Sequence, residues 1–469
     1  MKALWQLSAI EQAALVAGRK VSSLELIDAH LARIDAVNPT VNAIVRVVAE
    51  EARAAARQAD SQVAAGAKLG PLHGVPFTVK ENIDVAGQPT TQGSKVLAGA
   101  IAACDAPIVE RMKAAGGILL ARTNLPDMAL RVHTDSSLHG LTRNPWNLRR
   151  TAAGSSGGEA AALATGMSPI GLGNDIGGSL RNPANACGIA SIKPSAGRVP
   201  SVETIPVEDP LLVAQLMMAQ GPMARRVADV RLGLQILMGA HPRDPWSISL
   251  PFAGAAQAKP LRIAMVAEPP GGSIDPVIAA TVRKAGAALA DAGYQVVDLC
   301  PPRYEEALEV WNQFLFGDLA AIVDQLYPLM GESGAQFLHY VLDPLPTYDA
   351  KSMSLMFAQR HAIAREWSVF MEDYPLVLTP TWTQLPFEHG FDAESSEGAA
   401  AAMAMMRPVR PANLLGLPSA CVPAGRDQAT GLPIGVLLTG RRFREDLCLE
   451  AAEAVEARLG LATPIDPVA

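Results

Sequence analysis

The chain has 469 residues, 49% of them hydrophobic and 18% charged, which describes a globular protein with enough core for one large α/β domain or two to three smaller ones. Its net charge of −7 leaves no basic surface for nucleic acid, and we expect neither a signal peptide nor an apolar run long enough to span a membrane. Five scattered cysteines without CxxC spacing predict reduced thiols in a cytoplasmic protein, with no disulfide framework and no metal site.

Residues 7–66 are predicted to form helices. Between positions 24 and 34, leucine and isoleucine recur at steps of three and four, the spacing of one buried helix face. His30 falls outside this apolar series and is predicted to lie at the surface. The pair Asn38–Pro39 is predicted to end this helix, because proline lacks the N–H group that a helix interior needs.

A short strand ending in a lysine is predicted next. Val75, Phe77 and Val79 alternate with Pro76 and Thr78, and Lys80 follows directly. A lysine is most often a solvated surface charge. Because this one follows an apolar strand and precedes a turn, a buried environment is also open to it.

The helix–turn–strand pattern of residues 106–121 recurs over residues 261–299, which indicates an α/β architecture with helices covering a sheet. Residues 301–372 are predicted to be helical. Their aromatic and methionine side chains are typical of core, with the lining of an apolar substrate pocket as the alternative. The predicted elements that complete the chain are a strand over 374–380, a mobile flap over 391–404, a strand–turn–strand unit over 413–440 and a helix over 445–459.

The stretch from Arg149 to Arg181 carries the strongest chemical signal. It holds two glycine- and serine-rich turns, Gly154–Gly158 and Gly177–Ser179, on either side of a small-residue helical run and a short apolar segment. Flexible linkers would have a similar composition, but linkers rarely enclose a helix and a strand. Turns with a hydroxyl group and bare backbone N–H groups favour a site for developing negative charge.

The common catalytic motifs fit this stretch poorly. The chain has no HExxH and no GxxxxGK[ST]. Gly154–Gly158 has the letters of G-x-S-x-G but lacks the apolar strand that should precede such a serine. A serine can instead be activated by a buried neutral lysine, whose pKa must then fall from about 10.4 to ~7–8.

Three segments at their spacing resemble the amidase signature family. These are V-K-E-N with Lys80, A-G-S-S-G-G-E with Ser155 and N-D-I-G-G-S-L-R with Ser179, separated by 75 and 24 residues. Further segments such as G-P-L-H-G-V-P-F, A-R-T-N-L-P-D-M-A and A-N-L-L-G-L-P extend the likeness to essentially the whole chain. The resemblance implies one domain over 1–469, with a mixed central β-sheet covered by helices on both faces. It places a catalytic core at about 70–200 and a variable pocket region at about 200–255 and 301–410.

The resemblance also implies the role of each site residue. Ser179 would be the acylated nucleophile, Ser155 the bridging serine after a cis Gly154–Ser155 peptide bond, and Lys80 the terminal base. No cofactor or metal is implied. The backbone N–H groups of the oxyanion hole would be those of Ile176, Gly177, Gly178 and Ser179, and the supporting residues would be Gly154, Ser156, Asp175 and Arg181. Ala153, Asn174 and Leu180 depart from the usual family residues without removing a catalytic group.

The implied activity is hydrolysis of the C–N bond of a small hydrophobic acyl or aryl amide through an acyl-enzyme, with carbamates (urethanes) and esters as further substrates. The alternative is the glutaminase-like component of a tRNA-dependent amidotransferase. Such components typically carry an acidic residue before P-A-N-L-x-G-L-P, and Met403–Pro408 holds none here. A catalytically silent binding protein is disfavoured, because all three catalytic side chains are present. The expected partner is the small-molecule substrate, and the chain is expected to be a monomer or homodimer.

Overall fold

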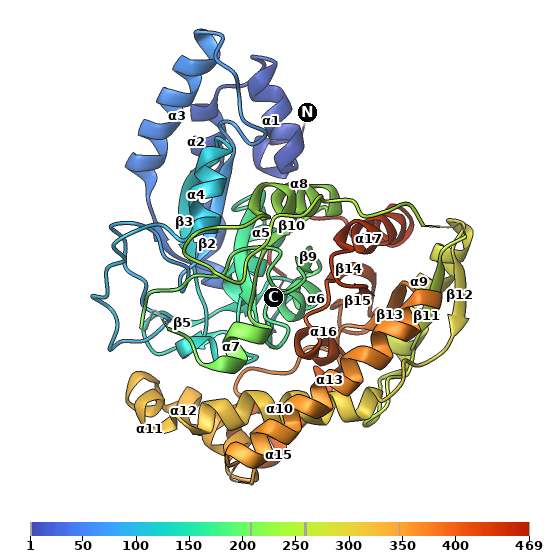
Figure 1. The fold of residues 1–469 in the computed structure, drawn as a ribbon. Helices are drawn as coiled ribbons and strands as arrows, with labels where there is room; N and C mark the ends of the chain where they lie inside the picture. Colours follow the sequence, from blue (N-terminus) through green and yellow to red (C-terminus); the bar gives the residue numbers. More distant parts are fainter. Residues whose placement is uncertain (1, 207–208, 258–259, 347, 469) are drawn as a thin grey trace.

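A single eleven-stranded mixed β-sheet runs through the chain (Figure 1). The computed structural model describes residues 2–206, 209–257, 260–346 and 348–468. The strands of the sheet are, in spatial order, β1 (Ile44–Val47), β3 (Ile118–Thr123), β2 (Pro76–Lys80), β8 (Ile170–Asp175), β10 (Ala219–Ala224), β9 (Ala190–Lys193), β14 (Ser419–Arg426), β15 (Pro433–Gly440), β13 (Leu376–Pro380), β11 (Arg262–Met265) and β12 (Gln295–Asp298). Strand β2 is parallel to both of its neighbours, β3 and β8, whereas β8 and β10 are antiparallel.

Helices cover both faces of this sheet, which confirms the predicted α/β class. One face packs on α4 (Pro107–Ala114), α8 (Val227–Leu237), α9 (Pro276–Asp291) and α17 (Glu445–Leu459). The other packs on α2 (Ser23–Val41), α3 (Ala49–Ala64), α5 (Gly157–Ala164) and α6 (Arg181–Cys187). Successive side chains of a strand point to opposite faces, so Phe77 and Val79 of β2 enter the first core while Thr78 and Lys80 face α5.

A group of helices lies along one edge of the molecule, at the bottom of Figure 1. It is formed by α10 (Tyr304–Ala320), α11 (Val323–Leu326), α12 (Glu332–Leu342), α13 (Ala350–Asp373), α14 (Phe391–Glu394) and α15 (Ser396–Met405). The remaining elements include α1 (Ala9–Ala17), α7 (Leu212–Met217), α16 (Arg410–Leu414) and two small hairpins, β4 (Asp135–Ser136) with β5 (Gly140–Leu141) and β6 (Arg143–Asn144) with β7 (Asn147–Thr151). Within the described ranges, no helix is long and apolar enough to span a membrane.

The start of the chain differs from the prediction in three respects. Pro39 lies inside α2, which continues to Val41. Beyond the helix, the Asn38 side chain accepts hydrogen bonds from the N–H groups of Ala43 and Ile44. Residues 44–47, between the end of the first predicted helix and the next one, form strand β1, which was not predicted. His30 is buried, not exposed, and its ring nitrogens lie 3.0 Å from Gln12 Nε2 and from the carbonyl oxygen of Gly166.

Other predicted elements match closely. Strand β2 ends at Lys80, the strand–turn–strand unit is β14–β15, and the last helix covers Glu445–Leu459. Segment 391–404 is mostly helical, and Asp392 on it forms a buried ion pair with Arg131. Its mobility as a flap stays a prediction. The division into a core at about 70–200 and variable segments at about 200–255 and 301–410 stays a prediction. Positions 207–208 and 347 of those segments lie outside the described residues.

Candidate active site

Lys80 is a fully buried lysine at the end of β2. Its Nζ atom lies 2.6 Å from Ser155 Oγ and 2.5 Å from Asn174 Oδ1. Burial lowers the pKa of Lys80 to about 7, although the negative charges of Glu203, Asp175 and Glu159 oppose this shift. A large share of the side chain is therefore neutral near pH 7, and a neutral amine can accept a proton.

Ser155 is positioned by close packing around the first glycine- and serine-rich turn. The Gly154–Ser155 peptide bond is cis. A Cβ atom on Gly154 would lie 2.6 Å from the carbonyl oxygen of Arg131, and one on Gly158 would lie 2.4 Å from the backbone nitrogen of Asn124. Because those neighbours are backbone atoms, the turn accepts only glycine at these two positions.

The two turns are joined by a hydrogen bond of the backbone. The N–H group of Ser156 donates to the carbonyl oxygen of Ser179 at 3.3 Å. The side chain of Ser156 plays a smaller part, because its buried Oγ has no hydrogen-bond partner among the described residues. The structure thus brings Lys80, Ser155 and the backbone of Ser179 into one site at the carboxyl ends of β2 and β8.

The turn that carries Ser179 leads from β8 into α6. Gly178 has a φ of +100°, a conformation that strongly favours glycine. Its N–H group donates to Asp175 Oδ1 at 2.7 Å, so this donor, expected in the oxyanion hole, is already engaged. No hydrogen bond to a described residue is recorded for the N–H groups of Ile176, Gly177 and Ser179.

Asp175 and Arg181 form a buried ion pair that holds this turn in place. Arg181 Nε and Nη2 donate to the two carboxylate oxygens of Asp175 at 3.0 Å each, and both side chains are fully buried. Burial raises the pKa of Asp175, but the charge and hydrogen bonds of Arg181 outweigh it and lower the pKa to about 2. Asn413 Nδ2 also donates to Asp175 Oδ1, at 2.9 Å, and ties the turn to α16.

An aromatic side chain backs the same turn. Trp311 on α10 is buried, and its Nε1–H donates to the carbonyl oxygen of Ile176 at 3.3 Å. A Cβ atom on Gly177 would lie 2.6 Å from the Trp311 ring and 3.7 Å from the methyl group of Met406. Most of the aromatic and methionine side chains predicted over 301–372 to be core or pocket lie in the core, and Trp311 among them also contacts the turn.

Three polar residues near Lys80 were missed as site residues by reasoning from the sequence. Asn174 was noted only as a departure from the family, and Glu203 carried no recognisable signal. Glu159 is fully buried and accepts hydrogen bonds from Thr78 and Thr123, while burial raises its pKa to about 7. Its signal was its position as the one charged residue in a run of small residues.

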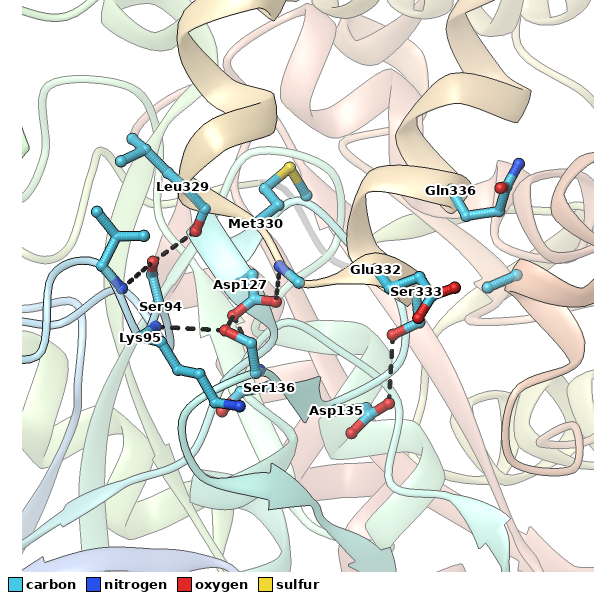
Figure 2. Close-up of a pocket in the computed structure, with 14 residues that line it drawn as sticks. Ser94, Lys95, Asp127, Asp135, Ser136, Leu329, Met330, Glu332, Ser333 and Gln336 are labelled. Atoms are coloured by element: carbon cyan, nitrogen blue, oxygen red, sulfur yellow. Dashed lines mark hydrogen bonds between the residues drawn. The ribbon is translucent and has the colours of Figure 1, made fainter.

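A cavity of about 720 Å³ lies elsewhere, between Ser94, the Asp127 loop and the start of α12 (Figure 2). Its lining does not include Lys80, Ser155 or Ser179. Asp127 already accepts hydrogen bonds from the N–H groups of Ser137 and Gly331, at 3.0 and 2.8 Å. The contact with Gly331 joins the loop that contains Asp127 to the start of α12. Among the described residues there is no group of His, Cys, Asp or Glu that could hold a metal ion.

Similarity to known proteins shows which family the chain belongs to. The profile of the Amidase family matches residues 25–449. The chain belongs to the amidase signature family. It is a hydrolase that acts on amide C–N bonds.

Several relatives span nearly the whole chain. It is 39% identical to an indoleacetamide hydrolase of Bradyrhizobium diazoefficiens, over 98% of this chain and 87% of that protein. It is 35% identical to an acylamidase of Rhodococcus erythropolis, over 96% and 95%. A component of the glutamyl-tRNA(Gln) amidotransferase of Synechococcus sp. (strain CC9605) is 32% identical, over 93% of each chain. The solved 6-aminohexanoate cyclic dimer hydrolase superposes with a TM-score of 0.84 at 29% identity, covering 98% of both chains.

Proposed function

We propose that this amidase hydrolyses small hydrophobic amides, in particular primary amides of arylacetic acids, through Ser179, Ser155 and Lys80. The observation that carries the proposal is the buried Lys80 amine, 2.6 Å from Ser155 Oγ and with its pKa lowered to about 7 by burial. A surface lysine would stay protonated at neutral pH and could not act as a base.

In the acylation step, Ser179 Oγ attacks the carbonyl carbon of the amide. Its proton passes to Ser155, and the proton of Ser155 passes to the neutral amine of Lys80. The tetrahedral intermediate carries a negative oxygen, for which the N–H groups of Ile176, Gly177 and Ser179 are the available donors. The C–N bond then breaks, and Lys80 returns a proton through Ser155 to the leaving amine.

In the second step, water attacks the acyl-enzyme and loses its proton along the same relay. The bond between the acyl carbon and Ser179 Oγ breaks, Ser179 regains a proton, and the carboxylic acid leaves. A carbamate or an ester presents the same carbonyl carbon. We therefore include both as substrates, since the alcohol of an ester is an easier leaving group than an amine.

Two features support an aromatic acyl group. Trp311 and Met406 provide an apolar wall behind the Ser179 turn. The relative that is 39% identical is an indoleacetamide hydrolase. We further place the protein in the cytoplasm, since all five of its cysteines are free thiols.

The test is a hydrolysis panel with the purified protein. It contains indole-3-acetamide, phenylacetamide, an anilide, an aliphatic amide, an aryl carbamate and an aryl ester, with Ser179→Ala as the blank. We expect release of ammonia and carboxylate to be fastest with the two arylacetamides. Absence of hydrolysis of every hydrophobic amide would contradict the proposal.

The second candidate is the glutaminase-like component of a tRNA-dependent amidotransferase, which the 32% identical Synechococcus protein favours. Arg407 and Arg410 occupy the segment where an acidic side chain would bind the α-amino group of glutamine. Glutamine belongs in the panel for this reason. Glutamine hydrolysis together with copurifying partner proteins would establish this second candidate instead.

A further inference from the structure

Asn174 connects the candidate base to a carboxylate from a distant segment. Its Oδ1 lies 2.5 Å from Lys80 Nζ, and its Nδ2 donates to Glu203 Oε1 at 3.1 Å. Gln220, the direct partner of Asn174 across β8 and β10, donates to the same Glu203 oxygen at 3.3 Å. Glu203 is half-buried, whereas both amide side chains are buried.

The carboxylate decides which way the amide of Asn174 points. An ionised carboxylate only accepts hydrogen bonds, so the atom of Asn174 that faces Glu203 must be the donor Nδ2. The acceptor Oδ1 then faces Lys80. Among the described residues, Glu203 makes the side-chain hydrogen bond that distinguishes the two orientations of the amide on that side of Asn174.

The orientation matters because of the valence of a neutral amine. Such an amine has two N–H groups and one lone pair, and only the lone pair can take the proton of Ser155. With Oδ1 of Asn174 facing it, Lys80 donates an N–H to the amide and keeps its lone pair for Ser155. With the amide reversed, the NH2 group would donate to the lone pair and compete with Ser155 for it.

We propose that Glu203 is a positioning residue for the base: it orients Asn174 so that Lys80 presents its lone pair to Ser155. This inference rests on the proposed role of Lys80. It assigns a function to a side chain outside the three catalytic positions, 123 residues beyond Lys80 in the sequence.

Glu203 also acts on Lys80 through its charge. The carboxylates that stabilise the protonated lysine are those of Glu203, Asp175 and Glu159. Burial raises the pKa of Glu203 to about 7, while the charge of Lys80 opposes this shift and that of Asp84 adds to it. Glu203 is therefore mostly ionised above pH 7, the range in which Lys80 is neutral. Removing the charge of Glu203 lowers the pKa of Lys80, and the acidic limb of the activity profile should move to lower pH.

The test compares Glu203→Gln, Glu203→Leu and a matched control, Asp209→Asn, which removes an exposed carboxylate six residues further along. For each variant, kcat and KM for phenylacetamide are measured between pH 5 and 9. Glutamine can still offer an oxygen to Asn174, whereas leucine cannot. We expect Glu203→Leu to lower kcat about tenfold or more with KM changed less than about twofold, and Glu203→Gln to lower kcat less than about threefold. Both should move the acidic limb to lower pH, and the control should match the wild type.

An unchanged kcat and acidic limb in Glu203→Leu would overturn the proposal. If Glu203→Leu does not fold, as judged by its thermal transition, the acidic limb of Glu203→Gln decides, and an unshifted limb would count against the proposal. Ser179→Ala and Lys80→Arg serve as blanks. If either blank retains activity, the proposed triad fails; if both are inactive while the Glu203 variants behave as wild type, only the role of Glu203 fails.

Discussion

Lys80 Nζ and Ser155 Oγ lie 2.6 Å apart, although 75 residues separate them in the sequence. The contact forms because β2 and β8 are parallel neighbours, and β8 follows the α5 helix that begins just after Ser155. It turns a buried amine and a serine hydroxyl into a unit that can relay a proton.

Replacing Ser155 should damage catalysis far more than replacing its neighbour Ser156. Ser155→Ala removes the bridge to Lys80, and we expect kcat to fall about 10²–10⁴-fold. Ser156→Ala removes a hydroxyl that makes no side-chain hydrogen bond among the described residues, and kcat should fall less than about tenfold. Steady-state kinetics on one arylacetamide measures both. Equal losses in the two variants would argue against the relay.

Activity should depend on pH through Lys80. The protonated lysine cannot accept a proton, so kcat/KM should rise with pH up to the pKa of Lys80, about 7, and fall about tenfold per pH unit below it. Lys80→Arg should be inactive at every pH in this range, because arginine stays protonated. A wild-type profile that is flat from pH 5 to pH 8 would exclude Lys80 as the base.

Breaking the buried ion pair between Asp175 and Arg181 should cost stability. Asp175→Asn leaves the buried Arg181 without its charged partner, and the free energy of unfolding should fall by about 3–5 kcal/mol in urea titrations. The matched control is Glu268→Gln, which breaks an exposed pair with Arg283. The control should change stability little, because solvent screens exposed pairs. A comparable loss in both variants would show that burial does not govern the effect.

Glycine is required at 158 but not at 99. A Cβ atom on Gly158 would lie 2.4 Å from the backbone of Asn124, so Gly158→Ala should lower the free energy of unfolding by about 1–3 kcal/mol. Gly99 is exposed with nothing within 4 Å of its Cβ position, and Gly99→Ala should be neutral or slightly stabilising. Thermal and urea unfolding of the two variants tests the contrast. A stable Gly158→Ala protein would mean that the backbone here can move apart.

Several features were predictable because they depend on neighbouring residues alone. The alternation of Val75, Phe77 and Val79 predicts the strand that ends at Lys80, and the glycines around Ser155 and Ser179 predict turns. The spacing of the three segments identified the family. Prediction from pattern was wrong at His30, where contact with Gly166 overrides the local signal, and at Pro39, which lies in the last turn of α2 instead of ending the helix.

By itself, then, the sequence determined the α/β class, the family and two of the side chains that meet at the site, Lys80 and Ser155. The tertiary structure alone decided their chemistry. The pKa of Lys80 depends on how completely water is excluded and on carboxylates from β8, α5 and the segment of Glu203. Likewise, the engaged N–H of Gly178 and the orientation of Asn174 are set by Asp175 and Glu203. Desolvation and charge act through space between segments far apart in the chain, so no local pattern of residues encodes them.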